Sequence, residues 1–194
     1  MEPHVTPLAD IAPKVATARV AYAAGTTRPY AWRKDTLDRM ADLLRKHEQK
    51  LLDALAADFG KPAFEAWFTE IAFVLNDIAH TQAHLRGWMQ PEKVYTPLAY
   101  KPSKSFVVPE PVGVVCVIAP WNYPVQLLLS PMVAAIAAGN AVVAKPSELA
   151  PHASAALAAL INEMGDPAIT VVEGGVAETT ELLAQRFDHI IYTG

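Results

Sequence analysis

Hydrophobic residues in the first half of the chain recur at the spacing of an amphipathic α-helix. Leucines and a methionine within residues 37–55 fall three, four or seven positions apart, with arginine, lysine and glutamate between them. Residues 64–85 repeat this spacing, and turn-forming glycines and prolines interrupt it at residues 25–29 and 60–62. The pattern predicts a helical layer with one apolar face over residues 8–88.

The composition changes between Val94 and Pro111. Prolines recur there, and two short β-favouring segments, residues 94–95 and 105–108, alternate with turns. We interpret this segment as an extended arm or hairpin, although an irregular surface loop would fit the same residues equally well.

Residues 112–192 show a different pattern, in which short apolar runs alternate with helical segments. The runs are continuously apolar, which is typical of strands covered on both faces. Short connections between strands and helices favour a parallel sheet flanked by helices, which is a doubly wound α/β fold. We expect strands at residues 112–119, 141–144, 168–172 and 189–192. We expect a first helix that starts near Pro124 or Gln126 and ends at Gly139, a second over residues 151–164 and a third over residues 179–185.

One stretch raises the question of a membrane span, because residues 111–144 contain no charged side chain. Prolines and the Gly139–Asn140 pair divide this stretch into segments of roughly 8 to 14 residues, the length of buried strands and helices. The net charge is −4 and the sequence contains no basic stripe, so we expect no nucleic-acid and no membrane partner. A single cysteine and the lack of a signal-like start favour a cytoplasmic protein.

Candidate site residues follow the predicted strands, because open α/β sheets bind ligands at the carboxyl ends of their strands. Lys145 could donate to hydroxyls or a phosphate, and Glu148 could accept from both hydroxyls of a ribose. Alternatively, Ser147 or Glu148 only caps the next helix. Gly174–Gly175 could let a nucleotide approach closely or simply form a tight turn, and no G-x-G-x-x-G motif follows any strand.

Asn122 lies in the sequence PWNYP, directly after the first predicted strand. An amide side chain at this point could donate a hydrogen bond to a developing oxyanion, and it would stay neutral at every pH. Asparagine is also a common turn residue, so the residue type leaves both roles open.

Other reactive side chains have simpler structural interpretations. Cys116 lies within the most apolar predicted strand, where burial raises a thiol pKa, so we expect a structural role. His80 and His84 lack the glutamate of a metalloprotease helix, and no metal site is expected. Three acidic residues are expected on the solvated face of a helix, namely Glu65, Glu70 and Asp77.

The segment EPVGVVCVIAPWNYPVQLLLSPMVAAIAAGNAVVAKPSE resembles the aldehyde dehydrogenase superfamily, and the final GGVAETTELLAQRFDHIIYTG resembles its class 3 branch. The resemblance extends from about Phe64 to Gly194 and is weaker before that. It implies the family's variant Rossmann fold, with an N-terminal helical layer and a short bridging hairpin. We therefore divide the chain into residues 1–92, the N-terminal helical part of the cofactor-binding domain, residues 93–111, the bridging hairpin, and residues 112–194, the NAD(P)-binding αβ core.

The resemblance also implies roles for individual residues. Asn122 would stabilise the tetrahedral intermediate, and Lys145 with Glu148 would bind the adenosine ribose of NAD or NADP. Gly194 would open the turn that contacts the pyrophosphate, and the hairpin would make oligomer contacts, as expected of a homodimer. The residues expected at the cofactor are Ile118, Ala119, Pro120, Trp121, Lys145, Ser147, Glu148, Gly175 and Gly194.

The function implied is NAD(P)-dependent oxidation of an aldehyde to a carboxylic acid. In the family the nucleophilic cysteine and the main glutamate base lie beyond the YTG turn, so we expect a cofactor-binding portion that is inactive by itself. A non-catalytic dinucleotide-binding or assembly module is an alternative, as is a relative that acts reductively or on semialdehydes. The choice between NAD and NADP stays open, because Lys145 tolerates a 2′-phosphate whereas Glu148 favours free ribose hydroxyls.

Overall fold

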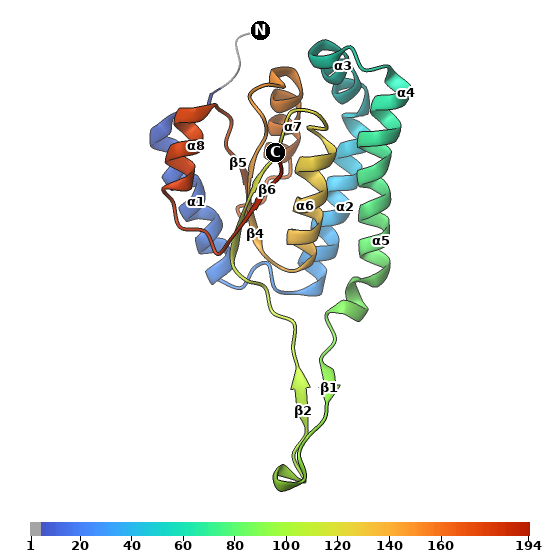
Figure 1. The fold of residues 1–194 in the computed structure, drawn as a ribbon, viewed down its shortest axis with the longest axis vertical. Coiled ribbons are helices and arrows are strands. Elements are labelled where there is room, and N and C mark those ends of the chain that lie inside the picture. The colour runs from blue at the N-terminus through green and yellow to red at the C-terminus, as the bar shows by residue number, and fades with distance from the viewer. Residues whose placement is uncertain (1–4) are drawn as a thin grey trace.

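The computed structural model describes residues 5–194, and a four-stranded parallel sheet forms the centre of the fold (Figure 1). Its strands are β3 (Val114–Ile118), β4 (Ala141–Lys145), β5 (Ile169–Val171) and β6 (His189–Tyr192), which are connected by α6 (Gln126–Ala137), α7 (Pro151–Glu163) and α8 (Val176–Leu183). The order across the sheet is β5-β4-β3-β6. The chain therefore moves outward from β3 to β5 and then returns to place β6 on the other side of β3, as the doubly wound prediction requires.

Within the described residues, five α-helices and one π-helical turn precede the hairpin and the sheet. They are α1 (Leu8–Ala23), α2 (Tyr30–Lys46), α3 (Glu48–Phe59), α4 (Ala63–Ala66), the π-helical turn (Trp67–Ile71) and α5 (Ala72–Trp88). The breaks between α1 and α2 and between α3 and α4 coincide with the glycine and proline clusters that predict them. Gly60 ends α3 with φ of +65°, a left-handed conformation that favours glycine.

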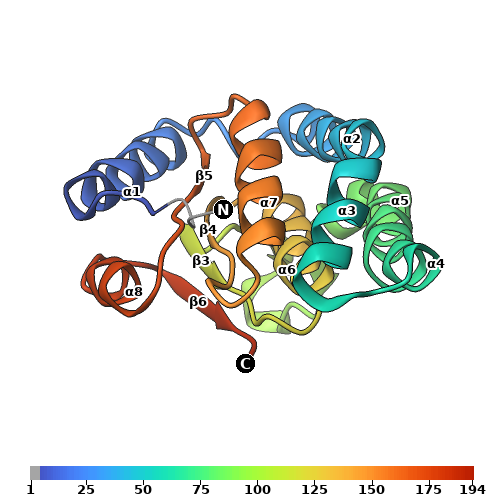
Figure 2. The same ribbon diagram turned by 90° about the horizontal axis from the view of Figure 1, so that it is seen from above.

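Helices cover both faces of the sheet (Figure 2). Val115 and Val117 of β3 point into the larger core, which also contains residues of α2, α3, α5, α6 and α7. Their neighbours Val114, Cys116 and Ile118 point into a smaller core with α1 and α8. Successive side chains of a strand alternate between the two faces, so this division explains why β3 is apolar at every position.

The predicted N-terminal helices are present, and they divide between the two faces of the sheet, which the sequence pattern does not specify. Helix α1 packs against the face of the sheet that it shares with α8, whereas α2, α3 and α5 lie on the opposite face (Figure 2). Helical periodicity identifies the apolar side of each helix, but it contains no information about which face of the sheet that side covers.

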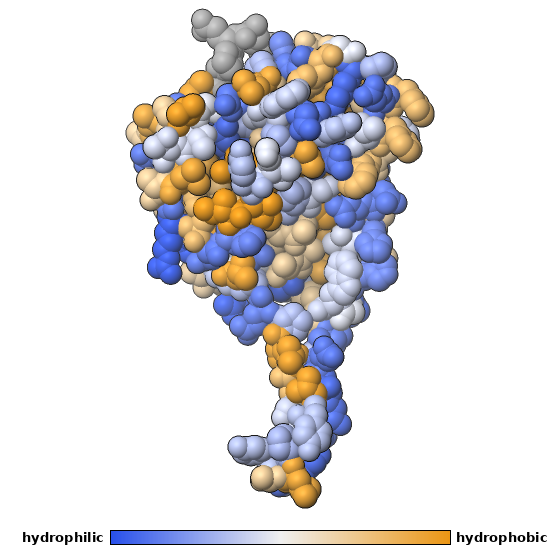
Figure 3. Space-filling view, viewed as in Figure 1, coloured by the Kyte–Doolittle hydropathy of each residue, from blue (hydrophilic) through white to orange (hydrophobic). Residues whose placement is uncertain are grey.

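A two-stranded antiparallel hairpin projects from the body of the molecule (Figure 1). Its strands are β1 (Glu92–Val94) and β2 (Ser105–Val107), with Glu92 opposite Val107. The Thr96 hydroxyl accepts a hydrogen bond from the Ser105 amide at 2.9 Å. The segment is thus the predicted hairpin and not an irregular loop. Apolar side chains lie exposed along it (Figure 3), among them Tyr95 and Leu98, which are more than 80% exposed.

The uncharged stretch of residues 111–144 is divided among β3, a loop, α6 and β4. Within residues 5–194, no helix combines the length and the apolar character that a membrane crossing would need.

Candidate functional site

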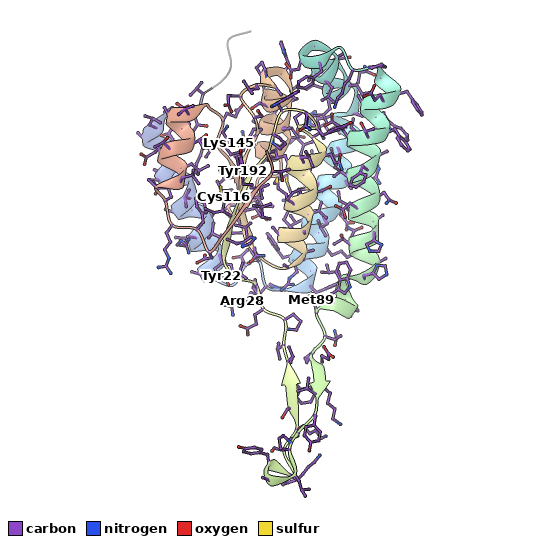
Figure 4. All side chains as sticks on the ribbon, in the orientation of Figure 1. Tyr22, Arg28, Met89, Cys116, Lys145 and Tyr192 are labelled. Carbon is purple, nitrogen blue, oxygen red and sulfur yellow. The ribbon has the colours of Figure 1, made fainter. Side chains whose placement is uncertain are left out.

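A cleft of about 800 Å³ opens at the carboxyl ends of β3, β4 and β6. Strand order reverses beside β3, and ligands of open α/β sheets bind at such a switch point. Lys145 and Tyr192 lie at this end of the sheet, near the C-terminus (Figure 4). All the predicted site residues except Gly175 line the cleft, namely Ile118, Ala119, Pro120, Trp121, Asn122, Lys145, Ser147, Glu148 and Gly194.

Lys145 and Glu148 form an ion pair at the cleft. The Lys145 ammonium lies 2.6 Å from the Glu148 carboxylate, and its side chain is only 5% exposed, against 40% for Glu148. Partial burial is the largest single influence and would by itself raise the pKa of Glu148, but the hydrogen bond from Lys145, a backbone hydrogen bond and the charge of Lys145 together outweigh it, so the pKa is lowered. Glu148 is therefore ionised at neutral pH and presents a hydrogen-bond acceptor to the cleft.

The helix-capping alternative does not describe Ser147 or Glu148. Ser147 accepts a hydrogen bond from the Leu149 amide at 3.3 Å, before α7 begins. The first amides of α7 are instead bound by Asp58 of α3, at 3.2 Å from the amide of His152 and 2.8 Å from that of Ala153. The carboxylate of Glu148 is thus left for the cleft and Lys145.

The glycine pair after β5 serves mainly to form a turn. Gly174 has φ of +149°, and a Cβ there would approach Glu178 Cγ to 2.3 Å. Gly175 does not line the cleft, and its own Cβ would be 3.8 Å from Glu148 Cγ, an ordinary contact. The Glu178 carboxylate accepts from the Gly175 amide at 2.8 Å, so α8 starts at Val176, three residues earlier than the sequence pattern predicts. This geometry favours the tight-turn alternative.

Helix α8 contributes cleft residues that the sequence analysis missed. Val176, Thr179, Thr180 and Leu183 all line the cleft, and their spacing of three, one and three residues is that of one helical face. A helix predicted to start at Gly175 would have identified this face. The other cleft residues missed are Leu127, Leu149 and Tyr192, and Thr193 lines the cleft beside the predicted Gly194.

Asn122 lies in the loop between β3 and α6. The residue is exposed and lines the cleft, and its side-chain amide makes no hydrogen bond to any protein group within residues 5–194. The amide is therefore available to donate to a bound molecule. Trp121, which is half exposed, lies next to it, with its ring centroid 6.1 Å from that of Phe59.

Glu70 is completely buried, so its expected place on a solvated helix face is wrong. Its carboxylate lies 2.5 Å from the Lys61 ammonium, which also donates to the backbone carbonyl of Asn122 at 2.9 Å. Glu70 follows buried Ala66 by four residues and precedes buried Val74 by four, a spacing that places it in the apolar row of the helix. This spacing is the sequence signal that would have predicted the burial of Glu70. Glu65 is exposed, as expected, and Asp77 is half-buried.

Cys116 is fully buried in the sheet (Figure 4). Its register partners are Val143 of β4 on one side and Ile190 of β6 on the other. Removal from water raises the pKa of its thiol to about 12. A thiol in this state is not available for nucleophilic attack, which agrees with the structural role predicted for it.

The rings of His80 and His84 lie next to one another along α5, with centroids 4.3 Å apart and planes tilted by 34°. His84 Nδ1 lies 2.8 Å from the His80 carbonyl oxygen, so one of its ring nitrogens already has a partner. Across residues 5–194, no group of three or more His, Cys, Asp or Glu side chains is arranged to hold a metal ion.

Comparison with known proteins shows which family this chain resembles. The model of the aldehyde dehydrogenase family matches residues 4–194. Aldehyde dehydrogenase family 3 member H1 of Arabidopsis thaliana is 46% identical over 171 residues, which are 88% of this chain and 35% of that protein. The dimeric NADP-preferring aldehyde dehydrogenase of Canis lupus familiaris is 40% identical over 188 residues, which are 96% of this chain and 42% of that protein.

A solved structure agrees with these sequence matches. The substrate-bound AldH of Staphylococcus aureus matches with a TM-score of 0.90 and 38% identity, over 93% of this chain and 40% of that one. The chain thus spans well under half the length of these relatives. The match to a family 3 member agrees with the class 3 resemblance of the final segment. Fold, cleft and comparisons together establish that this chain belongs to the aldehyde dehydrogenase family.

Proposed function

We propose that this chain forms the NAD(P)-binding part of an enzyme that oxidises an aldehyde to a carboxylic acid. The observation that carries the proposal is the arrangement of three side chains on one cleft. The Lys145–Glu148 pair and the unpartnered amide of Asn122 all line it, at the carboxyl ends of parallel strands. The first two suit a ribose, and the third suits an oxyanion.

The residues present fit a dinucleotide. The ionised Glu148 can accept from the ribose hydroxyls while Lys145 donates to them. Val176 and Leu183 give the cleft an apolar side suited to the flat adenine base. The loop from Ala119 and the residue Gly194 would accommodate the pyrophosphate and the second nucleotide. When bound, the nicotinamide would accept hydride from the substrate.

Asn122 would act on the substrate's oxygen. Attack on an aldehyde places negative charge on that oxygen, and a neutral amide that is already oriented can donate to it at every pH. The nucleophile and the base that activates water would come from residues outside this chain, because the only cysteine is buried and its pKa is raised to about 12.

The substrate test compares the chain with the complete polypeptide that its gene encodes. We expect the complete protein to form NADH or NADPH from benzaldehyde, and its Asn122→Ala variant to lose about 10²- to 10³-fold in kcat. The chain alone should show no turnover. Turnover by the chain that Cys116→Ala abolishes would refute this division of roles.

The alternative is a dinucleotide-binding or assembly module without catalysis, which the burial of the only thiol favours for the chain taken alone. A stop codon directly after Gly194 would support this module. An open reading frame that reaches a cysteine motif would support the enzyme.

The hairpin is our candidate for the contact surface of a homodimer. It projects from the body and exposes large apolar side chains, including Tyr95, Leu98, Tyr100 and Phe106. Exposed apolar patches of this kind commonly mark protein interfaces, and the matched dog enzyme is named dimeric. Sedimentation of the complete protein with and without residues 95–104 tests this, and an unchanged dimer after the deletion would contradict it.

A further inference from the structure

The ion pair between Lys61 and Glu70 is the most deeply buried one within residues 5–194. The side chain of Glu70 is fully buried and that of Lys61 is 12% exposed, whereas every other ion pair in this part of the chain has at least one side chain 34% exposed or more. Taking two charges out of water costs free energy that their mutual attraction often fails to recover. Such a pair therefore calls for an explanation other than simple stabilisation.

Both partners of this pair bind the loop that contains Asn122. Lys61 donates to the backbone carbonyl of Asn122 at 2.9 Å, and its ammonium lies 4.1 Å from the ring centroid of Tyr123. Glu70 accepts from the amide of Val125 at 2.8 Å. Lys61 thus contacts the loop at the carbonyl of Asn122 and at the side chain of Tyr123, and Glu70 binds it at the amide of Val125.

The location of Glu70 strengthens this connection. It lies in the π-helical turn Trp67–Ile71, a type of turn that often occurs at functional sites. Its carboxylate lies at the N-terminus of α6, where free amides favour a negative charge. The pair thus contacts the loop at Asn122 and at Val125, and neither of its residues lines the cleft.

We propose that Lys61 and Glu70 are positioning residues, which fix the loop so that the Asn122 side chain points to the oxyanion. Fixing the carbonyl of Asn122 fixes the peptide plane that contains its Cα, and this restricts the directions available to its Cα–Cβ bond. A displacement of about 1 Å at a reacting centre can cost about 10²-fold in rate. The inference rests on the function proposed above for Asn122.

The variants must avoid leaving one charge buried alone, because breaking a buried pair costs about 3–5 kcal/mol, a large part of a typical stability of about 5–15 kcal/mol. The double variant Lys61→Met/Glu70→Gln removes both charges and keeps the shapes, and Gln can still accept from the Val125 amide. The matched control is Lys34→Met/Asp38→Asn, which removes an exposed pair on α2 that contacts no part of the loop.

In the complete enzyme we expect the Lys61/Glu70 variant to lose about 10- to 100-fold in kcat, with KM changed less than about threefold. The control should retain its rate. When Asn122→Ala is already present, the Lys61/Glu70 change should alter kcat less than about twofold, because groups that act through one another are not additive. An equal loss in both backgrounds would overturn the proposal.

Amide hydrogen exchange on the chain itself provides a readout that needs no turnover. The Val125 amide, which donates to residue 70, and the Leu127 amide, which donates to the Tyr123 carbonyl, should exchange at least about tenfold faster in the Lys61/Glu70 variant, because the loop opens more often without the Lys61 contacts; both should be unchanged in the control. Unchanged exchange would overturn the proposal even if the enzyme is slowed. If exchange rises but Asn122→Ala leaves kcat unaltered, the oxyanion role proposed for Asn122 fails, and with it the catalytic purpose of the pair.

Discussion

Cys116 allows a direct test of whether this chain has a nucleophile of its own. Its side chain is fully buried and the pKa of its thiol is raised to about 12. At pH 8 the thiolate fraction of such a group is about 1 in 10⁴, whereas an ordinary thiol of pKa about 8.5 is roughly one quarter ionised. Ionisation alone therefore makes Cys116 more than about 10³-fold less reactive, before its lack of access is considered.

Alkylation with iodoacetamide, followed by mass spectrometry, measures this reactivity. We expect the native chain to stay unmodified at pH 8 while the same chain in urea is modified at the rate of a free cysteine. The denatured sample is the control that shows the reagent to be active. Rapid modification of the native chain would refute the burial of Cys116 and reopen it as a candidate nucleophile.

Three further predictions concern the framework of the site. Asp58→Ala should lower the unfolding free energy by about 1–2 kcal/mol in urea denaturation, because it removes the acceptor for the first amides of α7; an unchanged midpoint would contradict the capping role. Gly113→Ala should cost about 1–3 kcal/mol, since φ there is +143° and the new Cβ would meet the Asp188 carboxylate at 2.1 Å. The helical Gly87, with open space around it, is the control, and its change to Ala should be neutral or stabilising. The pKa of Asp188 is lowered, first by a hydrogen bond from a backbone amide and then by an arginine. Its contribution to stability is therefore present above its ordinary pKa of 3.8 and is lost as the pH falls through the lower folded value. Asp188→Asn should reduce the loss of stability between pH 6 and pH 3, and equal acid sensitivity of both proteins would contradict this.

The sequence predicts the sheet and most of the cleft because both depend on local patterns. The continuous apolar runs place β3 and β4 within one or two residues, and the short connections define the parallel order. Once the strands are known, their carboxyl ends identify Asn122, Lys145 and Glu148 as neighbours, and the structure places all three on one cleft. The cofactor and oxyanion roles of these residues remain predictions.

The features that the sequence did not predict depend on contacts between distant segments. The role of Glu70 depends on Lys61 and on the amide of Val125, which lies 55 residues further along the chain. The cap of α7 is an aspartate of α3 that lies 94 residues before His152. Charge predicts exposure for most carboxylates, and it fails at Glu70 because a buried partner and a helix N-terminus compensate for the lost hydration.

The central claim is that the Lys145–Glu148 pair binds the ribose of a dinucleotide, and titration calorimetry tests it most directly. We expect NAD to bind the chain, and Glu148→Ala to weaken this binding about 10- to 100-fold, as the loss of charged hydrogen bonds predicts. Glu65→Ala, which removes an exposed carboxylate on α4, should bind NAD as the unmodified chain does. The affinity for NADP should fall less or rise in Glu148→Ala, because Lys145 then meets the 2′-phosphate without a competing carboxylate. Equal NAD affinity of Glu148→Ala and the unmodified chain would contradict the account.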